Sequence, residues 1–164
     1  MDLERIVAEL APRLLACCFA WTRDRSLAEE AAQEALTALV QRWRRFGPPT
    51  CPEAFAFAIA RRRSVRVRLK QRLLAPLSLL FERRTEDRNP EDRAADRADL
   101  ARVRAALADL SGRDRAALLA VAVAELPLAE GARSLGISVS ALKMRLYRAR
   151  RRLAQALETN DAPK

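Results

Sequence analysis

A row of small and basic side chains near the C-terminus has the spacing needed to contact nucleic acid. Its members recur on one side of a predicted helix that starts after Ser138, with apolar residues on the other side. Small and basic side chains on an exposed helix face can reach base edges in a major groove, and arginines can contact phosphates. The pattern therefore predicts a DNA-contacting face. The residues of this face are Ser140, Lys143, Met144, Tyr147, Arg148 and Arg151.

The residues around this face have the order of a helix-turn-helix. Ala132 is small where two helices must approach closely, and Gly136 suits a left-handed turn. Ile137 would fill the space between the helices, and Ser138 is a good N-cap for the second one. The alternative is a helical hairpin whose basic face is only solvated. Turn, cap, apolar stripe and charge all favour the helix-turn-helix.

A second set of candidate contacts lies in the first half of the chain. A basic run begins with Arg61, Arg62 and Arg63. Aromatic faces beside arginines can hold an unstacked DNA strand, and ordinary core packing is the alternative for each aromatic. The candidate aromatics are Phe46, Phe55 and Phe57.

The charge of the chain favours a polyanionic partner. The net charge is +10 and the predicted pI is near 11.0, which points to nucleic acid first and to an anionic membrane second. An arginine-rich proteome would be a neutral explanation. However, residues 1–75 carry net +6, residues 76–99 net −2 and residues 100–164 net +6, so two basic blocks flank an acidic segment.

The sequence offers little for catalysis or metal binding. It has no histidine, no glycine-rich phosphate loop and no paired carboxylates in an apolar setting. The three cysteines, Cys17, Cys18 and Cys51, lack metal-ligand spacing and are expected to be reduced thiols. We therefore expect no enzyme, no metal and no cofactor.

No targeting or membrane-spanning segment is expected either. The apolar run of residues 14–21 is too short to cross a bilayer, and acidic residues lie at the N-terminus. The sequence thus predicts a cytoplasmic protein with no membrane insertion.

The fold class predicted from these patterns is all-α. Alanine, leucine and charged residues dominate, and glycine occurs only 4 times. Helices are expected over about 2–22 and up to about 46, with Ser26 and Glu29 as the capping box of the second. A third should start at Pro52. Two small helical domains, 1–75 and 100–158, would be joined by a flexible linker at 76–99.

The whole sequence resembles a known family, the extracytoplasmic-function (ECF) sigma factors. Residues 135–153 resemble the promoter-binding helix of region four, and residues 107–119 resemble that region's first helices. Residues 28–36 are similar to the polymerase-binding helix of region two, and residues 52–61 to the helix that opens the minus-ten element. The resemblance covers nearly the whole chain outside the linker, and the order of the motifs makes it specific.

The resemblance implies a role for each motif. The DNA-contacting face near the C-terminus would touch the minus-thirty-five element, and Phe55 with Arg61, Arg62 and Arg63 would contact the minus-ten element. Glu30, Gln33 and Glu34 would dock on the β′ clamp helices of core RNA polymerase. The β flap, promoter DNA and an anti-sigma factor are further partners that the resemblance implies.

The expected function is therefore a sigma factor that binds core RNA polymerase and directs promoter recognition, DNA melting and transcription initiation. The alternative is a helix-turn-helix regulator that binds duplex DNA without polymerase. A helical RNA-binding or adaptor protein is a third possibility. The docking face with Gln33 and Glu34, together with the basic Phe55 helix, distinguishes the first of these, since a simple regulator needs neither.

Overall fold

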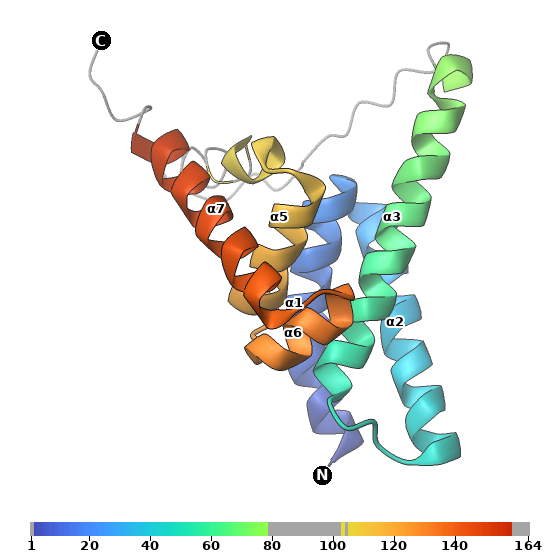
Figure 1. The fold of residues 1–164 in the computed structure, drawn as a ribbon. Helices are drawn as coiled ribbons and strands as arrows, with labels where there is room; N and C mark the ends of the chain where they lie inside the picture. Colours follow the sequence, from blue (N-terminus) through green and yellow to red (C-terminus); the bar gives the residue numbers. More distant parts are fainter. Residues whose placement is uncertain (1, 79–102, 104, 159–164) are drawn as a thin grey trace, which may run out of the picture.

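Helices make up most of the described chain. In this computed structural model the backbone is described for residues 2–78, 103 and 105–158, and the side chains for 2–69, 103 and 105–156. Within these ranges the regular secondary structure is entirely helical (Figure 1), which confirms the all-α prediction. No helix among the described residues is long and apolar enough to cross a membrane.

The N-terminal module is a bundle of three helices: α1 (Leu3–Thr22), α2 (Arg25–Phe46) and α3 (Pro52–Ser78). The carboxylate of Asp24 caps α2 by accepting a hydrogen bond from the amide of Leu27 at 2.9 Å. The capping box predicted at Ser26 and Glu29 is therefore wrong, because the helix starts one residue before Ser26 and already has an aspartate cap. The side chain of Glu29 instead pairs with Arg25 at 2.9 Å.

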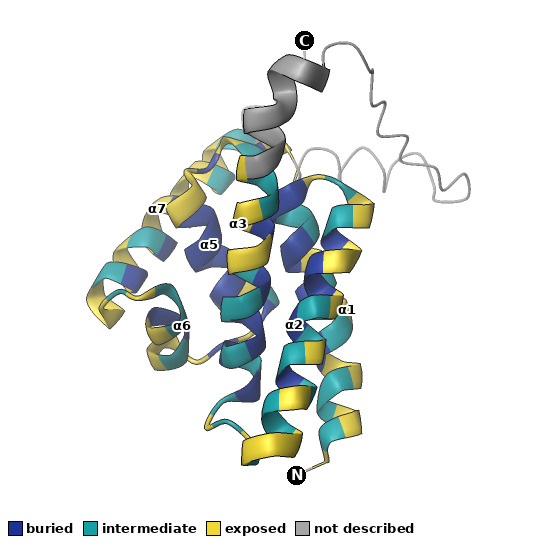
Figure 2. Ribbon diagram, turned by 90° about the vertical axis from the view of Figure 1, so that its right-hand side faces the viewer, coloured by how far each residue is buried: buried dark blue, intermediate teal, exposed yellow. Residues whose placement is uncertain are grey.

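The core of the N-terminal module combines large and small side chains. Trp21 and Phe57 meet edge to face with ring centroids 5.3 Å apart. Helix α2 contributes mainly alanines to this core, and their small side chains let the neighbouring helices approach closely. Figure 2 shows the result as a continuous buried zone where the three helices face one another.

The described part of the C-terminal module begins at residue 103. Residues 105–109 are helical, and then come α5 (Gly112–Leu118), a π-helical turn η1 (Leu119–Val123), α6 (Leu128–Leu135) and α7 (Val139–Glu158). Its core is a separate cluster of buried apolar side chains. The members of this cluster are Leu110, Ala117, Leu118, Ala132, Leu142, Leu146 and Ala149.

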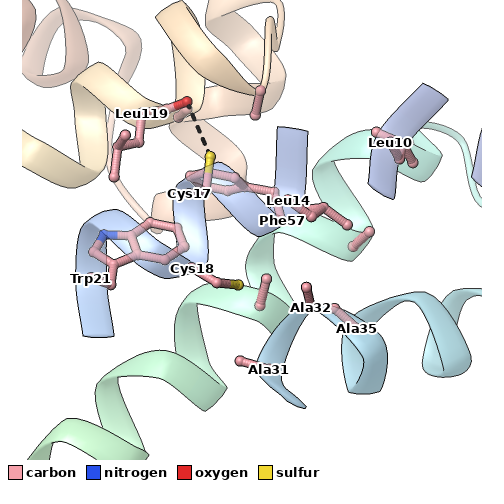
Figure 3. Packing of buried hydrophobic residues seen from close by; sticks show 14 of the residues in the cluster. Leu10, Leu14, Cys17, Cys18, Trp21, Ala31, Ala32, Ala35, Phe57 and Leu119 are labelled. Atoms are coloured by element: carbon pink, nitrogen blue, oxygen red, sulfur yellow. Dashed lines mark hydrogen bonds between the residues drawn. The ribbon is translucent and has the colours of Figure 1, made fainter. Parts of the chain in front are cut away.

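The two modules are packed together. Leu119 and Ala120 of η1, which are 2% and 0% exposed, belong to the core of the N-terminal module and not to their own. The thiol of Cys17 donates a hydrogen bond to the carbonyl of Leu119 across this junction, with 3.9 Å between sulfur and oxygen (Figure 3). The guanidinium of Arg13 donates to the carbonyl of Val123 at 3.3 Å.

The expected linker falls largely outside the described residues. Helix α3 continues to Ser78, past the boundary predicted at residue 75, and the remainder of the 76–99 segment is not described. The prediction of two helical modules agrees with the structure. Their close packing was not foreseen, because an interface between modules has no periodic signature in the sequence.

Candidate nucleic-acid interface

Helices α6 and α7 form a helix-turn-helix whose turn is fixed by backbone geometry. Gly136 has φ +66°, a left-handed conformation that costs little only without a Cβ. The amide of Ile137 donates to the carbonyl of Ala132 at 3.0 Å, which closes the end of α6. The hydroxyl of Ser138 accepts from the amide of Ala141 at 3.2 Å and caps α7. The predicted turn and cap are both present.

The burial of α7 determines which of its side chains face solvent. Leu142, Leu146 and Ala149 are all at most 5% exposed and hold the helix on its module. With 3.6 residues per turn, the opposite side must then point outward. Met144 and Tyr147 are 57% and 61% exposed. The structure leaves the whole predicted face exposed, which comprises Ser140, Lys143, Met144, Tyr147, Arg148 and Arg151.

An acidic residue of α5, Asp114, lies close to two arginines of α7. The nearly buried carboxylate of Asp114 lies 3.9 Å from guanidinium nitrogens of both Arg148 and Arg152. Both guanidinium groups are more than half exposed, and a separation of 3.9 Å is too long for a hydrogen bond to Asp114. The side chain of Arg148 therefore keeps the freedom to turn toward a phosphate.

The predicted minus-ten arginines lie on α3 but have different surroundings. Arg62 and Arg63 are exposed, whereas Arg61 is half-buried. Burial, and then the like charge of Arg145 on α7, lower the pKa of the Arg61 guanidinium. No sequence pattern indicates that Arg145 approaches α3, because this contact exists only through the packing of the modules.

One of these arginines is already paired with a predicted polymerase contact. The Nε of Arg63 lies 2.6 Å from the carboxylate of Glu34, and both side chains are about half exposed. Glu30 and Gln33 are exposed on the same helix, α2. The structure thus places the candidate polymerase-docking residues beside the candidate DNA-contacting arginine, so one site can influence the other.

The three candidate aromatics have distinct environments. Phe57 has no exposed surface and Phe55 packs partly against the core, whereas Phe46 is 65% exposed. The guanidinium carbons of Arg42 and Arg45 lie 5.1 and 5.0 Å from the Phe46 ring centroid. An exposed ring flanked by cations is a suitable platform for an unstacked base. Phe46 therefore fits this role better than Phe55, which the resemblance favours.

Cys17 and Cys18 are not part of this surface. Cys17 and Cys18 are fully buried, and burial raises the pKa of Cys17 to about 12 and that of Cys18 to about 11. Both are therefore protonated at neutral pH and act as small apolar core residues. Among the described residues, no group of three or more histidine, cysteine or acidic side chains could hold a metal ion.

Both modules match family models of known proteins. Residues 6–73 match the family model described as sigma-70 region 2, and residues 100–153 match the model of sigma-70, region 4. An uncharacterized protein of Rhizobium meliloti (strain 1021) is 32% identical over 99% of this chain. The chain spans only 40% of the length of that relative.

Two solved structures share the fold across both modules. One is the sigma factor RpoE from Bartonella quintana, in complex with the anti-sigma factor NepR, with a TM-score of 0.75 and 22% identity. This match covers 96% of the present chain and 97% of the other. The second is CnrH in complex with the cytosolic domain of CnrY, with a TM-score of 0.70 and 23% identity, covering 98% and 89% of the two chains.

Proposed function

Because the chain belongs to the sigma-70 family, we propose that it binds core RNA polymerase and directs it to promoters. In this role it recognises the promoter, assists DNA melting and starts transcription, with no reaction of its own. The fold shared with RpoE and CnrH agrees with the predicted ECF subfamily. The observation that carries the proposal is the exposed small and basic face of α7 within a well-formed helix-turn-helix. A factor of this kind works in the cytoplasm, beside the polymerase.

The α7 face would read the minus-thirty-five element. Ser140, Lys143 and Met144 lie in the first half of α7, the half that enters a major groove in helix-turn-helix proteins. Arg148 and Arg151 come one to two turns later, where side chains reach the phosphate backbone. Tyr147 lies between the two groups and can contact either a base or the backbone.

The N-terminal module would hold the opened strand of the minus-ten element. Arg62 and Arg63 are exposed on α3 and can neutralise phosphates. Phe46, exposed between Arg42 and Arg45 at the end of α2, can stack on an unpaired base. Phe55 is half-buried and would act by supporting the start of α3.

The two modules must separate to contact both elements at once. Promoter elements centred near −10 and −35 are about 25 base pairs apart, which is about 85 Å along duplex DNA. Helix α3, the longest element, has 27 residues and so measures about 40 Å. The packed arrangement is therefore a resting state, and polymerase would hold the open one. The β′ clamp helices would contact α2 at Glu30, Gln33 and Glu34. The β flap would contact the C-terminal module.

An anti-sigma factor is a further proposed partner. RpoE and CnrH share the fold of this chain, and each is in complex with a second protein. A partner that favours the packed arrangement would keep the minus-ten and minus-thirty-five surfaces too close to span a promoter. By linkage, such a partner and the polymerase would oppose each other's binding.

The DNA-binding half of the proposal is tested on α7. Lys143→Ala should weaken promoter-duplex binding by about tenfold, because it removes one charged contact. Arg5→Ala is the matched control, since Arg5 is a highly exposed arginine at the start of α1 that pairs with Glu9. A gel-shift titration measures both. Unchanged affinity in Lys143→Ala would refute the recognition helix.

The polymerase-binding half is tested on α2. Replacing Gln33 and Glu34 together by alanine should reduce co-purification with core polymerase and leave promoter-duplex binding by α7 intact. Arg63→Ala is the control for the lost partner of Glu34, because it breaks the same ion pair while keeping the side chains of Gln33 and Glu34. Normal co-purification of the double variant would favour a helix-turn-helix regulator that works without polymerase.

A further inference from the structure

The side chain of Arg42 closes the end of α2. Its Nη1 donates a hydrogen bond to the carbonyl oxygen of Gly47 at 2.9 Å, five residues further along the chain. The amide of Gly47 in turn donates to the carbonyl of Trp43 at 2.9 Å. Gly47 is thus bonded to α2 through both its amide and its carbonyl group, so the chain leaves the helix in a fixed direction.

The backbone of Gly47 has a conformation that favours glycine, with φ +78° and ψ 177°. The following residues, Pro48 and Pro49, have a fixed φ and no amide hydrogen, so neither can donate a backbone hydrogen bond to α2. Among the described residues, the bond from Arg42 is the hydrogen bond that the carbonyl of Gly47 accepts. The orientation of this carbonyl therefore depends on Arg42.

The same guanidinium also contacts the ring of Phe46. Its carbon lies 5.1 Å from the ring centroid, within the range of a cation–π interaction. Because Phe46 is 65% exposed, core packing does not fix the orientation of its ring. A guanidinium is planar and rigid, so the bond to Gly47 through one nitrogen orients the whole group that lies over the ring. Arg42 thus connects the ring to the backbone beside it.

Arg45 contacts the same ring but is not held in this way. Its guanidinium carbon lies 5.0 Å from the centroid of Phe46. Its side chain makes no hydrogen bond or ion pair with the described residues. A base that stacks on the ring must displace a guanidinium from the face that it uses. Arg45 can move away more easily than Arg42, and its charge then remains close enough to reach a phosphate.

We propose that Arg42 is the positioning residue for DNA melting, because it fixes the Phe46 ring and the start of the 47–51 connection together. An unpaired base then meets a ring that is already in place. A ring ordered in advance loses less conformational freedom when the base binds, so the opened strand is held more tightly. Arg42 acts through Phe46 and not by touching the base. This role rests on the proposed function, in which Phe46 stacks on a base of the opened minus-ten strand.

Arg42→Lys tests this role because lysine keeps the positive charge. Its ammonium group is a point charge, and it cannot bond to Gly47 and cover the ring as a plane at the same time. Promoter opening by the full chain with core polymerase, measured by permanganate footprinting, should fall about fivefold, the effect of losing one ordinary hydrogen bond. Arg44→Lys is the matched control, since it makes the same change at an exposed arginine of the same helix. The control should open promoters normally, and both variants should bind promoter duplex normally through α7.

A double substitution separates positioning from general support of the fold. If Arg42 acts through the ring, adding Arg42→Lys to Phe46→Ala should cause little further loss of opening, because the two residues serve one function. Independent effects would multiply instead. The proposal is overturned if Arg42→Lys reduces opening as strongly in the Phe46→Ala background as in the natural chain. It is also overturned if Phe46→Ala impairs opening and Arg42→Lys does not.

A measurement without DNA or polymerase separates a failure of this inference from a failure of the proposed function. Carbon-13 relaxation of the aromatic rings in the free chain reports the order of the Phe46 side chain. Its signals are those that disappear from the spectrum in Phe46→Ala. The order of this ring should fall in Arg42→Lys and stay unchanged in Arg44→Lys. An unchanged ring in Arg42→Lys would refute the positioning. A loosened ring with normal opening in both Arg42→Lys and Phe46→Ala would instead refute the proposed melting role of Phe46.

Discussion

Shortening Leu119 to alanine should open the junction between the modules while leaving each module folded. Leu119 is 2% exposed and packs in the core of the N-terminal module, although α5 and η1 belong to the other one. Leu→Ala changes at buried sites cost about 2–5 kcal/mol. An interface can partly close around the lost volume, so we expect the lower value. About 2 kcal/mol lowers the ratio of packed to open molecules about thirtyfold.

Two neighbouring thiols report this opening separately. Cys17 points toward Leu119 and Cys18 points toward α3 (Figure 3). Both are fully buried, so alkylation requires opening. In Leu119→Ala, the alkylation rate of Cys17, followed by mass spectrometry at pH 8, should rise about thirtyfold and that of Cys18 much less.

A matched substitution separates opening from unfolding. Leu39→Ala removes an equally buried leucine from α2, away from the junction. It should weaken the N-terminal module as a whole and raise the labelling of Cys17 and Cys18 together. If Leu119→Ala also raises both thiols equally, or raises neither, then η1 does not hold the modules together and the reasoning is refuted.

Three other substitutions have outcomes fixed by the geometry. Gly131→Ala should raise the free energy of unfolding, measured by chemical denaturation, by up to about 1 kcal/mol, because alanine favours helix. Its Cβ would lie an ordinary 3.4 Å from Leu142 Cδ2. A loss of stability would mean that α6 cannot shift to make room for the added methyl group. The buried thiols should lower stability as pH rises from about 9 toward 12, because their folded pKa values are raised above 9.0 to about 12 and 11. The double variant Cys17→Ala/Cys18→Ala should show a flatter dependence in urea titrations at each pH, and an identical slope would contradict the raised values. Phe46→Ala should change the free energy of unfolding by no more than about 0.5 kcal/mol, as expected for an exposed ring. It should nevertheless reduce promoter opening in a permanganate footprint. Unimpaired opening would remove Phe46 from the melting site.

The sequence predicted the parts of the fold that rest on local rules. The turn at Gly136, the cap at Ser138 and the apolar stripe through Leu142 each arise from backbone sterics or helical period. The exposed face of α7 is set by the same stripe. The functional roles of the residues on that face stay predictions. The start of α2 was misplaced because Asp24 and Ser26 are both good caps, and only the backbone shows which one is used.

Contacts between the modules could not be predicted in this way. Leu119 and Ala120 continue an apolar run that a regular helix would direct into its own module. Nothing in the local pattern distinguishes a leucine for one core from a leucine for the other. The approach of Arg145 to Arg61, and the placement of Arg113 of α5 near Arg61 of α3, likewise depend on tertiary packing. The resemblance favoured Phe55 over Phe46, whereas exposure reverses that order.

The π-helical turn of η1 makes the middle of the C-terminal module sensitive to length. The amide of Ala124 bonds to the carbonyl of Leu119, five residues earlier, so this turn contains one residue more than an α-turn. That surplus residue rotates the chain downstream of Leu119, where Ala124 and Leu126 pack in the core of the N-terminal module together with Leu119. Removing a single residue here would restore the regular helical phase and swing Ala124 and Leu126 out of alignment. Length changes should therefore be tolerated far less in this turn than in surface loops.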